Sequence, residues 1–332
     1  MDNPVLVEVS RGTLVESRHR GAVAVVDADG ATVLTLGDVD RPVFPRSAVK
    51  ALQALPMVEA GAPEQFGFAD AELAIASASH GGEPMHVAVV AGMLERIGLD
   101  CTALACGAHW PGNQGAAHAL ARAGLTPSAL HNNCSGKHAG FLALAVTAGI
   151  DPGGYVEPHH PVQRDVRAAL EALAGITAAA CAIDGCSVPT WALPLTGVAH
   201  AFARFATGRG LGPARAAAAA RIRAACAQRP ELVAGSGRFC TQVMAALGTS
   251  VFIKGGAEGV MCAALPEQGL GIAIKCDDGA GRAAEVAAAA VIARLLPDAE
   301  AALAGFLRPL LRNWNGLTVG RIAPSAALSQ PG

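Results

Sequence analysis

The sequence predicts a mixed α/β (α+β) fold in which an antiparallel sheet, built from both ends of the chain, is covered by helices. Two observations predict it: short β-rich runs lie near both ends, and helical periodicity with loops rich in Gly and Pro dominates the stretch between them. We expect a single domain over residues 1–332. Residues 1–75 and 248–332 form its sheet-containing region, and residues 76–247 form a mainly helical insertion.

The first expected strands form a hairpin. Residues 22–26 and 31–36 are runs of Val, Ala, Thr and Leu, separated by the turn sequence Asp27-Ala-Asp-Gly30. Toward the other end, three further β-rich runs are separated by glycine-containing turns. These expected strands cover residues 249–254, 259–264 and 270–276.

Helices are expected between the two β regions and after the second one. Apolar residues recur there at helical spacing, and several stretches are rich in alanine, a strong helix former, as at 178–182, 216–220 and 287–290. The expected helices cover residues 84–97, 114–123, 137–148, 161–174, 190–206, 213–227, 238–247 and 280–296.

Composition excludes several classes of protein. The net charge is −2 with both signs interspersed, and only three Trp and one Tyr are present, so neither a basic stripe nor a stacking platform for nucleic acid is expected. No run approaches the ~20 apolar residues of a membrane helix, and no secretory signal is visible. Nine scattered cysteines favour reduced thiols. We therefore expect a cytoplasmic protein without nucleic-acid or membrane partners.

The motif Ser47-Ala-Val-Lys50 opens an apolar segment with a helical stripe. Residues three apart on a helix share a face, so the two side chains are expected to meet. A serine hydroxyl becomes a nucleophile when a base takes its proton, and lysine can be that base when its pKa is lowered. Near a helix N-terminus, free backbone N–H groups would help to stabilise an oxyanion. Together with the other motifs it predicts an acyl-transfer enzyme, and an ordinary N-terminal serine followed by a solvated lysine is the alternative for this motif alone.

A second serine and lysine accompany this motif. Ser79 follows an apolar run and precedes the flexible loop His80-Gly-Gly-Glu83. Lys254 would stand at the end of a strand, where two following glycines let substrate approach closely. We expect Ser79 to pair with Lys254. A loop-capping role for Ser79 and a structural role for His80 are the alternatives.

Cysteines suggest a metal site. Cys134-Ser-Gly-Lys137-His138 follows His131-Asn-Asn133, and Asp184-Gly-Cys186 could join from a distant loop. Two thiolates with nitrogen or oxygen donors suit Zn²⁺, and by spacing alone His138 or His131 would be the nitrogen ligand. Buried structural cysteines are the alternative. No P-loop, dinucleotide fingerprint, H-E-x-x-H or G-x-S-x-G motif occurs.

Five separated motifs resemble those of the rhizobial-type L-asparaginases, and the resemblance runs from about residue 5 to about residue 322. They are Phe44-Pro-Arg-Ser47-x-x-Lys50, Ser79-His-Gly-Gly-Glu83, Asn132-Asn-Cys134-Ser-Gly-Lys137-His138, Asp184-Gly-Cys186-x-x-Pro189 and Lys254-x-Gly-Ala-Glu-Gly259. The resemblance implies a homodimer with a fold like the serine β-lactamases and penicillin-binding proteins. It also implies hydrolysis of L-asparagine to L-aspartate and ammonia through a serine acyl-enzyme, in a single catalytic domain.

The resemblance also implies residue roles. Ser47 with Lys50 and Ser79 with Lys254 would be catalytic serine-lysine pairs. Cys134, Lys137 and Cys186 would bind zinc, in place of the histidine expected from spacing, and Lys137 would be held unprotonated by the metal. Groups expected around them, as substrate contacts or outer-shell partners, are Arg46, His80, His138 and Asp184.

Two departures and two alternatives accompany the resemblance. The S-D-N element of the β-lactamases is absent and Lys254-Gly-Gly256 replaces K-T-G, which argues against antibiotic hydrolysis. Cys240 stands in Gly237-Arg-Phe-Cys-Thr241 where the family suggests an aspartate. A serine-dependent glutaminase of the same fold would differ by one substrate methylene, which shifts discrimination by only about 1–3 kcal/mol. A non-catalytic zinc- or redox-responsive protein would use Cys134 and Cys186 alone.

Overall fold

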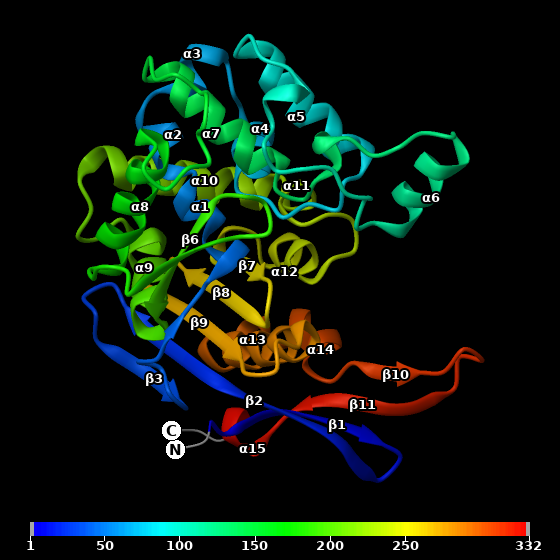
Figure 1. Ribbon diagram of the computed structural model, residues 1–332. Coiled ribbons are helices and arrows are strands. Elements are labelled where there is room, and N and C mark those ends of the chain that lie inside the picture. The colour runs from blue at the N-terminus through cyan, green and yellow to red at the C-terminus, as the bar shows by residue number, and fades with distance from the viewer. Residues whose placement is uncertain (1–2, 330–332) are drawn as a thin grey trace.

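A computed structural model describes residues 3–329 and has an antiparallel sheet with helices on both of its faces (Figure 1). Within these residues the main sheet is 8-stranded, in the order β10-β11-β1-β2-β9-β8-β7, with β3 added beside β2. Strands from both parts of the chain thus alternate in one sheet, which confirms the predicted mixed α/β class. The strands are β1 (Val5–Arg11), β2 (Leu14–Asp27), β3 (Thr32–Leu36), β7 (Phe252–Gly256), β8 (Val260–Leu265), β9 (Leu270–Cys276), β10 (Leu310–Arg312) and β11 (Thr318–Pro324).

The centre of the sheet is buried on both sides. Every residue of β8 is buried, and so is every residue of β9 except Lys275. Helix α9 (Leu195–Thr207) lies against one face so closely that a Cβ on Gly271 would stand 2.0 Å from the Ala199 carbonyl oxygen. Helix α13 (Gly281–Leu295) packs on β8 and β9 as well. This double cover explains the continuous hydrophobic runs of these strands.

The helical layer lies above the sheet in Figure 1 and carries most of the middle of the chain. It also contains short helices from residues 50–76, within the range that the sequence assigned to the sheet-containing region. Its helices are α1 (Lys50–Gln53), α2 (Leu55–Glu59), α3 (Ala62–Phe66), α4 (Asp70–Ala76), α5 (Pro84–Arg96), α6 (Gln114–Arg122), α7 (Ser135–Thr147), α8 (Pro161–Ala174), α10 (Pro213–Gln228), α11 (Pro230–Val233) and α12 (Phe239–Leu247).

Most predicted elements are confirmed. The hairpin pairs Val23 with Leu36 and Val25 with Leu34. Most expected helices are present with ends shifted by one or two residues, and the three late strands pair in sequence order. The predicted helix over 190–206 is wrong in its first part. Residues Pro189–Pro194 form strand β6 because prolines bracket a β-branched and aromatic run, and the helix begins only at Leu195.

A small second sheet was not expected. It has the order β4-β6-β5, where β4 is Pro42–Val43 and β5 is Ala180–Ile183. The alanine-rich stretch 178–182, read as a helix former, therefore lies largely in a strand, because pairing with β6 overrides its propensity. This sheet brings the segment before Ser47 next to the strands whose connecting turn holds Cys186.

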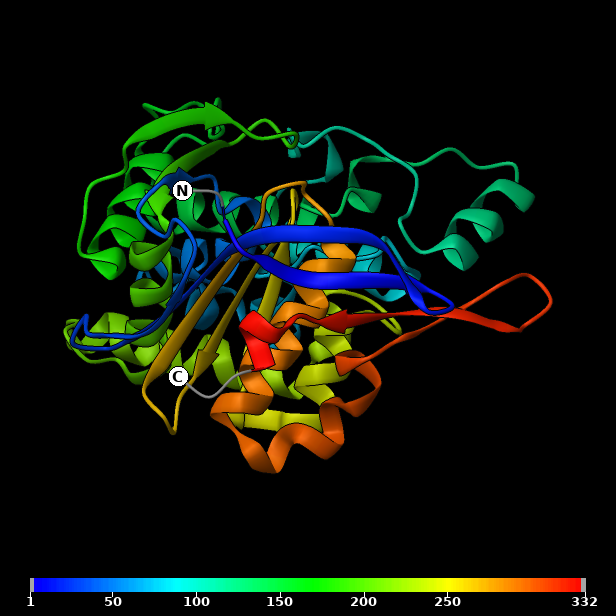
Figure 2. The same cartoon turned by 90° about the horizontal axis from the view of Figure 1, so that it is seen from below.

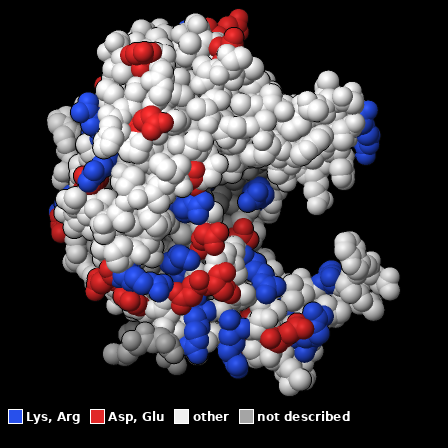
Figure 3. All heavy atoms as spheres, in the orientation of Figure 1, with Lys and Arg blue, Asp and Glu red and all other residues white. Residues whose placement is uncertain are grey.

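Strands β1, β10 and β11 were also missed. The turn between β1 and β2 and the turn between β10 and β11 extend beyond the body of the molecule (Figure 2). Charged side chains of both signs mix over the strands in Figure 3, while the helical layer shows few on this face. Within residues 3–329, no helix combines the length and the apolar character needed to cross a membrane.

Candidate active site

A cavity of about 330 Å³ brings together three of the four predicted catalytic residues. Ser47, Ser79 and Lys254 all line it, together with residues from the start of α12, from β7 and from α13. These segments are far apart in the sequence, so the cavity depends on the packing of β7 and α13 against the turns that carry the two serines.

Close packing at Gly256 places Lys254 beside Ser47. Ser47 lies in the 3₁₀ turn η1 (Arg46–Val49), directly before α1. A Cβ on Gly256 would stand 2.7 Å from the Pro45 carbonyl oxygen and 3.1 Å from the Ala48 nitrogen, so only glycine fits there. Residues 254 and 256 point to the same side of β7. The Lys254 side chain therefore extends toward the turn that carries Ser47.

The structure pairs Lys50 with Ser79, whereas the sequence predicted pairing with Ser47. Lys50 is 1% exposed, and its Nζ donates to Ser79 Oγ at 2.8 Å, to the Ala78 carbonyl at 2.6 Å and to the Asn133 carbonyl at 3.4 Å. A buried ammonium needs such acceptors, which explains why the side chain turns inward. The Ser47 hydroxyl has no hydrogen-bond partner among residues 3–329.

Lys254 is the pocket lysine with a lowered pKa. It is 2% exposed, and its Nζ donates to the Gly255 carbonyl at 2.8 Å. Burial lowers its pKa to about 7, and the nearby charge of Lys50 adds to the effect. A substantial share of this amine is therefore unprotonated at neutral pH. The predicted pairing of Lys254 with Ser79 is not formed, because Ser79 is bonded to Lys50.

The loop of Ser79 is fixed by backbone and histidine contacts. The Ser79 N–H donates to the Val233 carbonyl at 2.9 Å. The His80 Nδ1 accepts from the Gly82 N–H at 3.1 Å, and its Nε2 lies 2.9 Å from Ser135 Oγ. Burial, with the charges of His86 and Lys50, lowers the pKa of His80 well below its ordinary value. His80 lines the cavity as a neutral ring that holds the loop.

The predicted zinc ligands lie together in a thiol–amine cluster, which we define as Cys134, Lys137 and Cys186. Lys137 Nζ lies 3.1 Å from Cys186 Sγ, and the two thiols lie close enough for each to shift the pKa of the other. The first turn of α7 reaches this place because a Cβ on Gly136 would stand 2.2 Å from the Ile75 carbonyl oxygen, so α7 can approach α4 only at a glycine. The cluster is tied to the cavity by Lys50, whose Nζ is also 3.1 Å from Cys134 Sγ.

The chemistry of the thiol–amine cluster fits zinc. The hydrogen bond from Cys186 and the charges of Lys50 and Lys137 hold the pKa of Cys134 well below its ordinary value, which favours a thiolate. The hydrogen bond to Cys134 and burial raise the pKa of Cys186, and the negative charge of Cys134 helps to raise that of Lys137, so both carry protons without metal. Two sulfurs and a lysine nitrogen suit Zn²⁺ once the metal displaces these protons. Among residues 3–329 there is no group of three or more His, Cys, Asp and Glu side chains that could hold a metal ion, so a site here requires the lysine. His131 and His138, expected from spacing alone, are not needed for this donor set.

The remaining predicted residues surround the cluster. Arg46 donates from Nε and Nη2 to Asp184 Oδ1, at 2.9 and 2.7 Å, and its φ of 52° is unusual for a residue with a side chain. Burial would raise the pKa of Asp184, but hydrogen bonds from Arg46 and Gly185 outweigh it and lower that pKa. His138 is buried, which lowers its pKa, and its Nδ1 lies 2.6 Å from the Tyr155 hydroxyl.

Sequence reasoning missed several residues of the cavity. The cavity is also lined by residues to which the sequence assigned no role: Arg238, Glu285, His109 and Asn133. The His109 Nε2 accepts from the Asn133 N–H at 3.0 Å, which fixes the segment whose carbonyl accepts from Lys50. Cys240, which stood out as a departure, also lines the cavity. Three of these residues lay in segments that the sequence had singled out: Arg238 and Cys240 in Gly237–Thr241, and Asn133 in Asn132–His138.

Comparisons with known proteins give a family match. Residues 7–324 match the family described as L-asparaginase II. A search of curated proteins finds no match.

Among solved structures, the chain is similar to "Mglu" at 14% identity, covering 89% of this chain and 71% of that one with a TM-score of 0.45. "Mglu in its native form" matches at 16% identity over 88% of this chain and 68% of that one, with a TM-score of 0.42. A beta-lactamase from Mycobacterium bovis matches at 16% identity over 82% of this chain and 94% of that one, with a TM-score of 0.41.

Proposed function

The chain belongs to the L-asparaginase II family, and we propose that it hydrolyses L-asparagine to L-aspartate and ammonia through a serine acyl-enzyme. Membership of the family makes it a hydrolase that acts on amides. The substrate and the mechanism are our proposal, and they rest on the cavity lined by Ser47, Ser79 and Lys254.

The observation that carries the mechanism is the hydrogen bond of 2.8 Å between Lys50 Nζ and Ser79 Oγ, at the wall of a cavity that also holds Ser47 and a lysine with a pKa of about 7. A nucleophile, a neutral base and a second proton carrier are the groups that amide hydrolysis needs. The arrangement supplies all three from two serines and two lysines.

In the proposed acylation step, neutral Lys254 takes the proton of Ser47, and Ser47 Oγ attacks the carbon of the side-chain amide. The Lys50–Ser79 pair then delivers a proton to the amide nitrogen, the C–N bond breaks and ammonia leaves. Ser47 is assigned as the nucleophile because its hydroxyl is free of partners within the described chain and lies near the start of a helical segment.

In the proposed deacylation step, water replaces ammonia. The Lys50–Ser79 pair, which has given up a proton, accepts one from water as its oxygen attacks the acyl carbon. Lys254 returns its proton to Ser47 Oγ, the ester bond breaks and L-aspartate leaves. Both lysines regain their starting protonation states, so the cycle closes.

Zinc is proposed at the thiol–amine cluster, held by Cys134, Lys137 and Cys186. When bound there, it would supply a fixed positive charge beside the cavity. Lys50 contacts both Cys134 and Ser79, so the charge of the metal would influence the Lys50–Ser79 pair through this side chain. The homodimer and the cytoplasmic location remain predictions.

The test is ammonia release by the purified protein from L-asparagine and L-glutamine in parallel, with and without added Zn²⁺. Turnover of L-asparagine with a higher kcat/KM than L-glutamine supports the proposal, and the reverse order supports the glutaminase. Zinc binding without ammonia release from either amide would support the non-catalytic alternative instead. A chromogenic β-lactam assay should give no turnover.

A further inference from the structure

Two side chains of opposite charge, Arg238 and Glu285, line the cavity and have no role in the chemistry described above. Arg238 is the residue directly before α12, and Glu285 lies in the second turn of α13. Both lie near the same groups, because the charges of Arg238 and Glu285 each act on the buried thiol of Cys240. The cavity therefore presents a cation and an anion beside the reactive serines.

Neither charge is satisfied by the protein. Over residues 3–329, neither side chain makes a hydrogen bond or a close ion pair. Burial raises the pKa of Glu285, and the charge of Arg238 opposes this only in part. A half-buried carboxylate without a partner is unfavourable unless a ligand supplies a cation. Glu285 therefore calls for a cationic ligand group, and Arg238, which is exposed at the same cavity, is free to bind an anionic group of that ligand.

Other cations near the site are already occupied. Arg46 is bound by Asp184 and does not line the cavity, which argues against a role as a substrate contact. Lys50 is bonded to Ser79 and to backbone carbonyls. Among the described residues that line the cavity, Arg238 is the only arginine. Its guanidinium group is suited to bidentate binding of a carboxylate.

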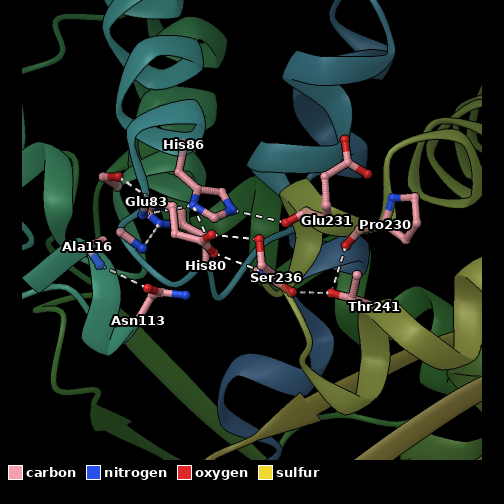
Figure 4. A network of polar contacts seen from close by, with 12 residues as sticks. His80, Glu83, His86, Asn113, Ala116, Pro230, Glu231, Ser236 and Thr241 are labelled. Atoms are coloured by element: carbon pink, nitrogen blue, oxygen red, sulfur yellow. Dashed lines mark hydrogen bonds and ion pairs between the residues drawn. The ribbon is translucent and has the colours of Figure 1, made fainter.

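The segment that carries Arg238 is held in place by a second polar network. Glu83 accepts from the Ser236 N–H at 2.9 Å and from the Ser236 hydroxyl at 2.6 Å. The Thr241 hydroxyl donates to the Gly235 carbonyl at 2.7 Å, and Figure 4 shows these contacts joining the His80–Glu83 loop to the start of α12. These hydrogen bonds hold both ends of the 235–241 segment, so the backbone that carries Arg238 has a defined position.

We propose that Glu285 binds the α-ammonium group and Arg238 binds the α-carboxylate of the substrate. This inference deepens the proposed function and rests on it. It names the two residues that would set the preference for a free zwitterionic head group over a peptide-linked or N-acylated one. A zwitterionic head group held by two opposite charges leaves the side chain as the part that can reach Ser47.

The experiment compares two variants with substrates that lack one head-group charge each. Succinamic acid lacks the α-amino group of L-asparagine, and 3-aminopropanamide lacks its α-carboxylate. Glu285→Gln should lower kcat/KM for L-asparagine about 10- to 100-fold and change that for succinamic acid less than about threefold. Arg238→Met should do the same for L-asparagine, and should spare 3-aminopropanamide instead.

Matched controls remove a charge of the same kind elsewhere. Arg282→Met removes an exposed cation from α13, near Glu16, and Glu267→Gln removes an exposed carboxylate from the turn after β8. Both should leave all three kcat/KM values unchanged. If Glu285→Gln and Arg238→Met lower L-asparagine and the truncated amides equally, the head-group assignment is overturned while the proposed function stands.

A binding experiment distinguishes failure of the head-group assignment from failure of the proposed function. Isothermal titration of each protein with L-aspartate and with succinate, which lacks the amino group, needs no turnover. If the native protein releases no ammonia but binds L-aspartate in a manner that both variants weaken, the proposed function fails and the head-group site stands. If the native protein neither releases ammonia nor binds L-aspartate, both are overturned.

Discussion

Lys50 donates from its Nζ to the Ser79 hydroxyl at 2.8 Å, although the two residues belong to different motifs of the sequence. The same amine lies 3.1 Å from Cys134, so one buried side chain joins the cavity to the thiol–amine cluster. The hydrogen-bond partners therefore differ from those expected from spacing: Lys50 donates to Ser79, and Lys254 is the amine whose pKa is about 7.

Ser47→Ala should abolish ammonia release, by at least about a thousandfold in kcat, because it removes the attacking oxygen. Ser79→Ala should lower kcat about 100-fold and leave measurable turnover, since it removes a proton carrier and keeps the nucleophile. Both are measured by ammonia release, with Tm and zinc content checked for a native fold. Ser10→Ala, in β1, is the control. If Ser79→Ala is the inactive variant and Ser47→Ala keeps most of its activity, the two serines exchange roles.

The activity should rise with pH through about 7. Lys254 acts as a base only when neutral, its pKa is about 7, and the neutral fraction grows as pH increases. The measurement is the profile of kcat/KM against pH, which reports ionisations of the free enzyme. Lys254→Met should lose most of the activity, and its residual rate should lack this ascending limb. A native profile that is flat from about pH 6 to 8 would count against Lys254 as the base.

Zinc should bind in a manner that requires both thiols of the cluster. Cys134→Ser and Cys186→Ser should each reduce bound metal from about one zinc per chain to a small fraction, because thiolates supply most of the affinity. Metal content after dialysis against free Zn²⁺ measures this. Cys181→Ser is the matched control, since Cys181 is exposed on β5 and only a few residues from Cys186. Equal zinc loss in the control, or none in the cluster variants, would place the metal elsewhere.

Gly256→Ala should damage both stability and activity. Its Cβ would meet the Pro45 carbonyl oxygen at 2.7 Å, so β7 would have to move away from the turn of Ser47, at a cost of about 1–3 kcal/mol. Urea denaturation and kcat measure the two effects. Gly255→Ala is the control, because its Cβ would meet the flexible Met261 side chain at 3.4 Å and Cys240 Sγ at 3.9 Å, which are ordinary van der Waals contacts. Similar losses in both variants would show that the contact with Pro45 is not the cause.

The sequence was sufficient for the fold class and for selecting Ser47, Ser79 and Lys254, which line one cavity, but not for the hydrogen-bond partners of these residues. Turn chemistry and periodicity located the hairpin and the late strands. Strand β6 was missed because its six residues run directly into a helix, and a short apolar run has no period that separates the two states. Lys50 was paired with Ser47 because spacing along a helix ignores acceptors from other segments, and Ala78 and Asn133 supply them.

Arg238 and Glu285 show a different limit. Each is an ordinary charged residue at or near the start of a helix, where sequence reasoning predicts a solvated surface. Their proximity to the same cavity depends on how α12 and α13 pack around β7 and β8, and no local pattern encodes that packing. Only the three-dimensional structure places these two charges beside the serines.

The strand order has a consequence for how the enzyme comes into being. Ser47 emerges early in synthesis, whereas β7, which carries Lys254, can join the sheet only through β8 and β9, whose partner β2 was made long before. The nascent chain must keep β2 from unwanted pairing while the helical layer is translated, and nascent chains with unpaired edges are prone to aggregation. Activity should therefore appear only late in folding, when β9 pairs with β2 and β7, joined through β8, brings Lys254 to Ser47.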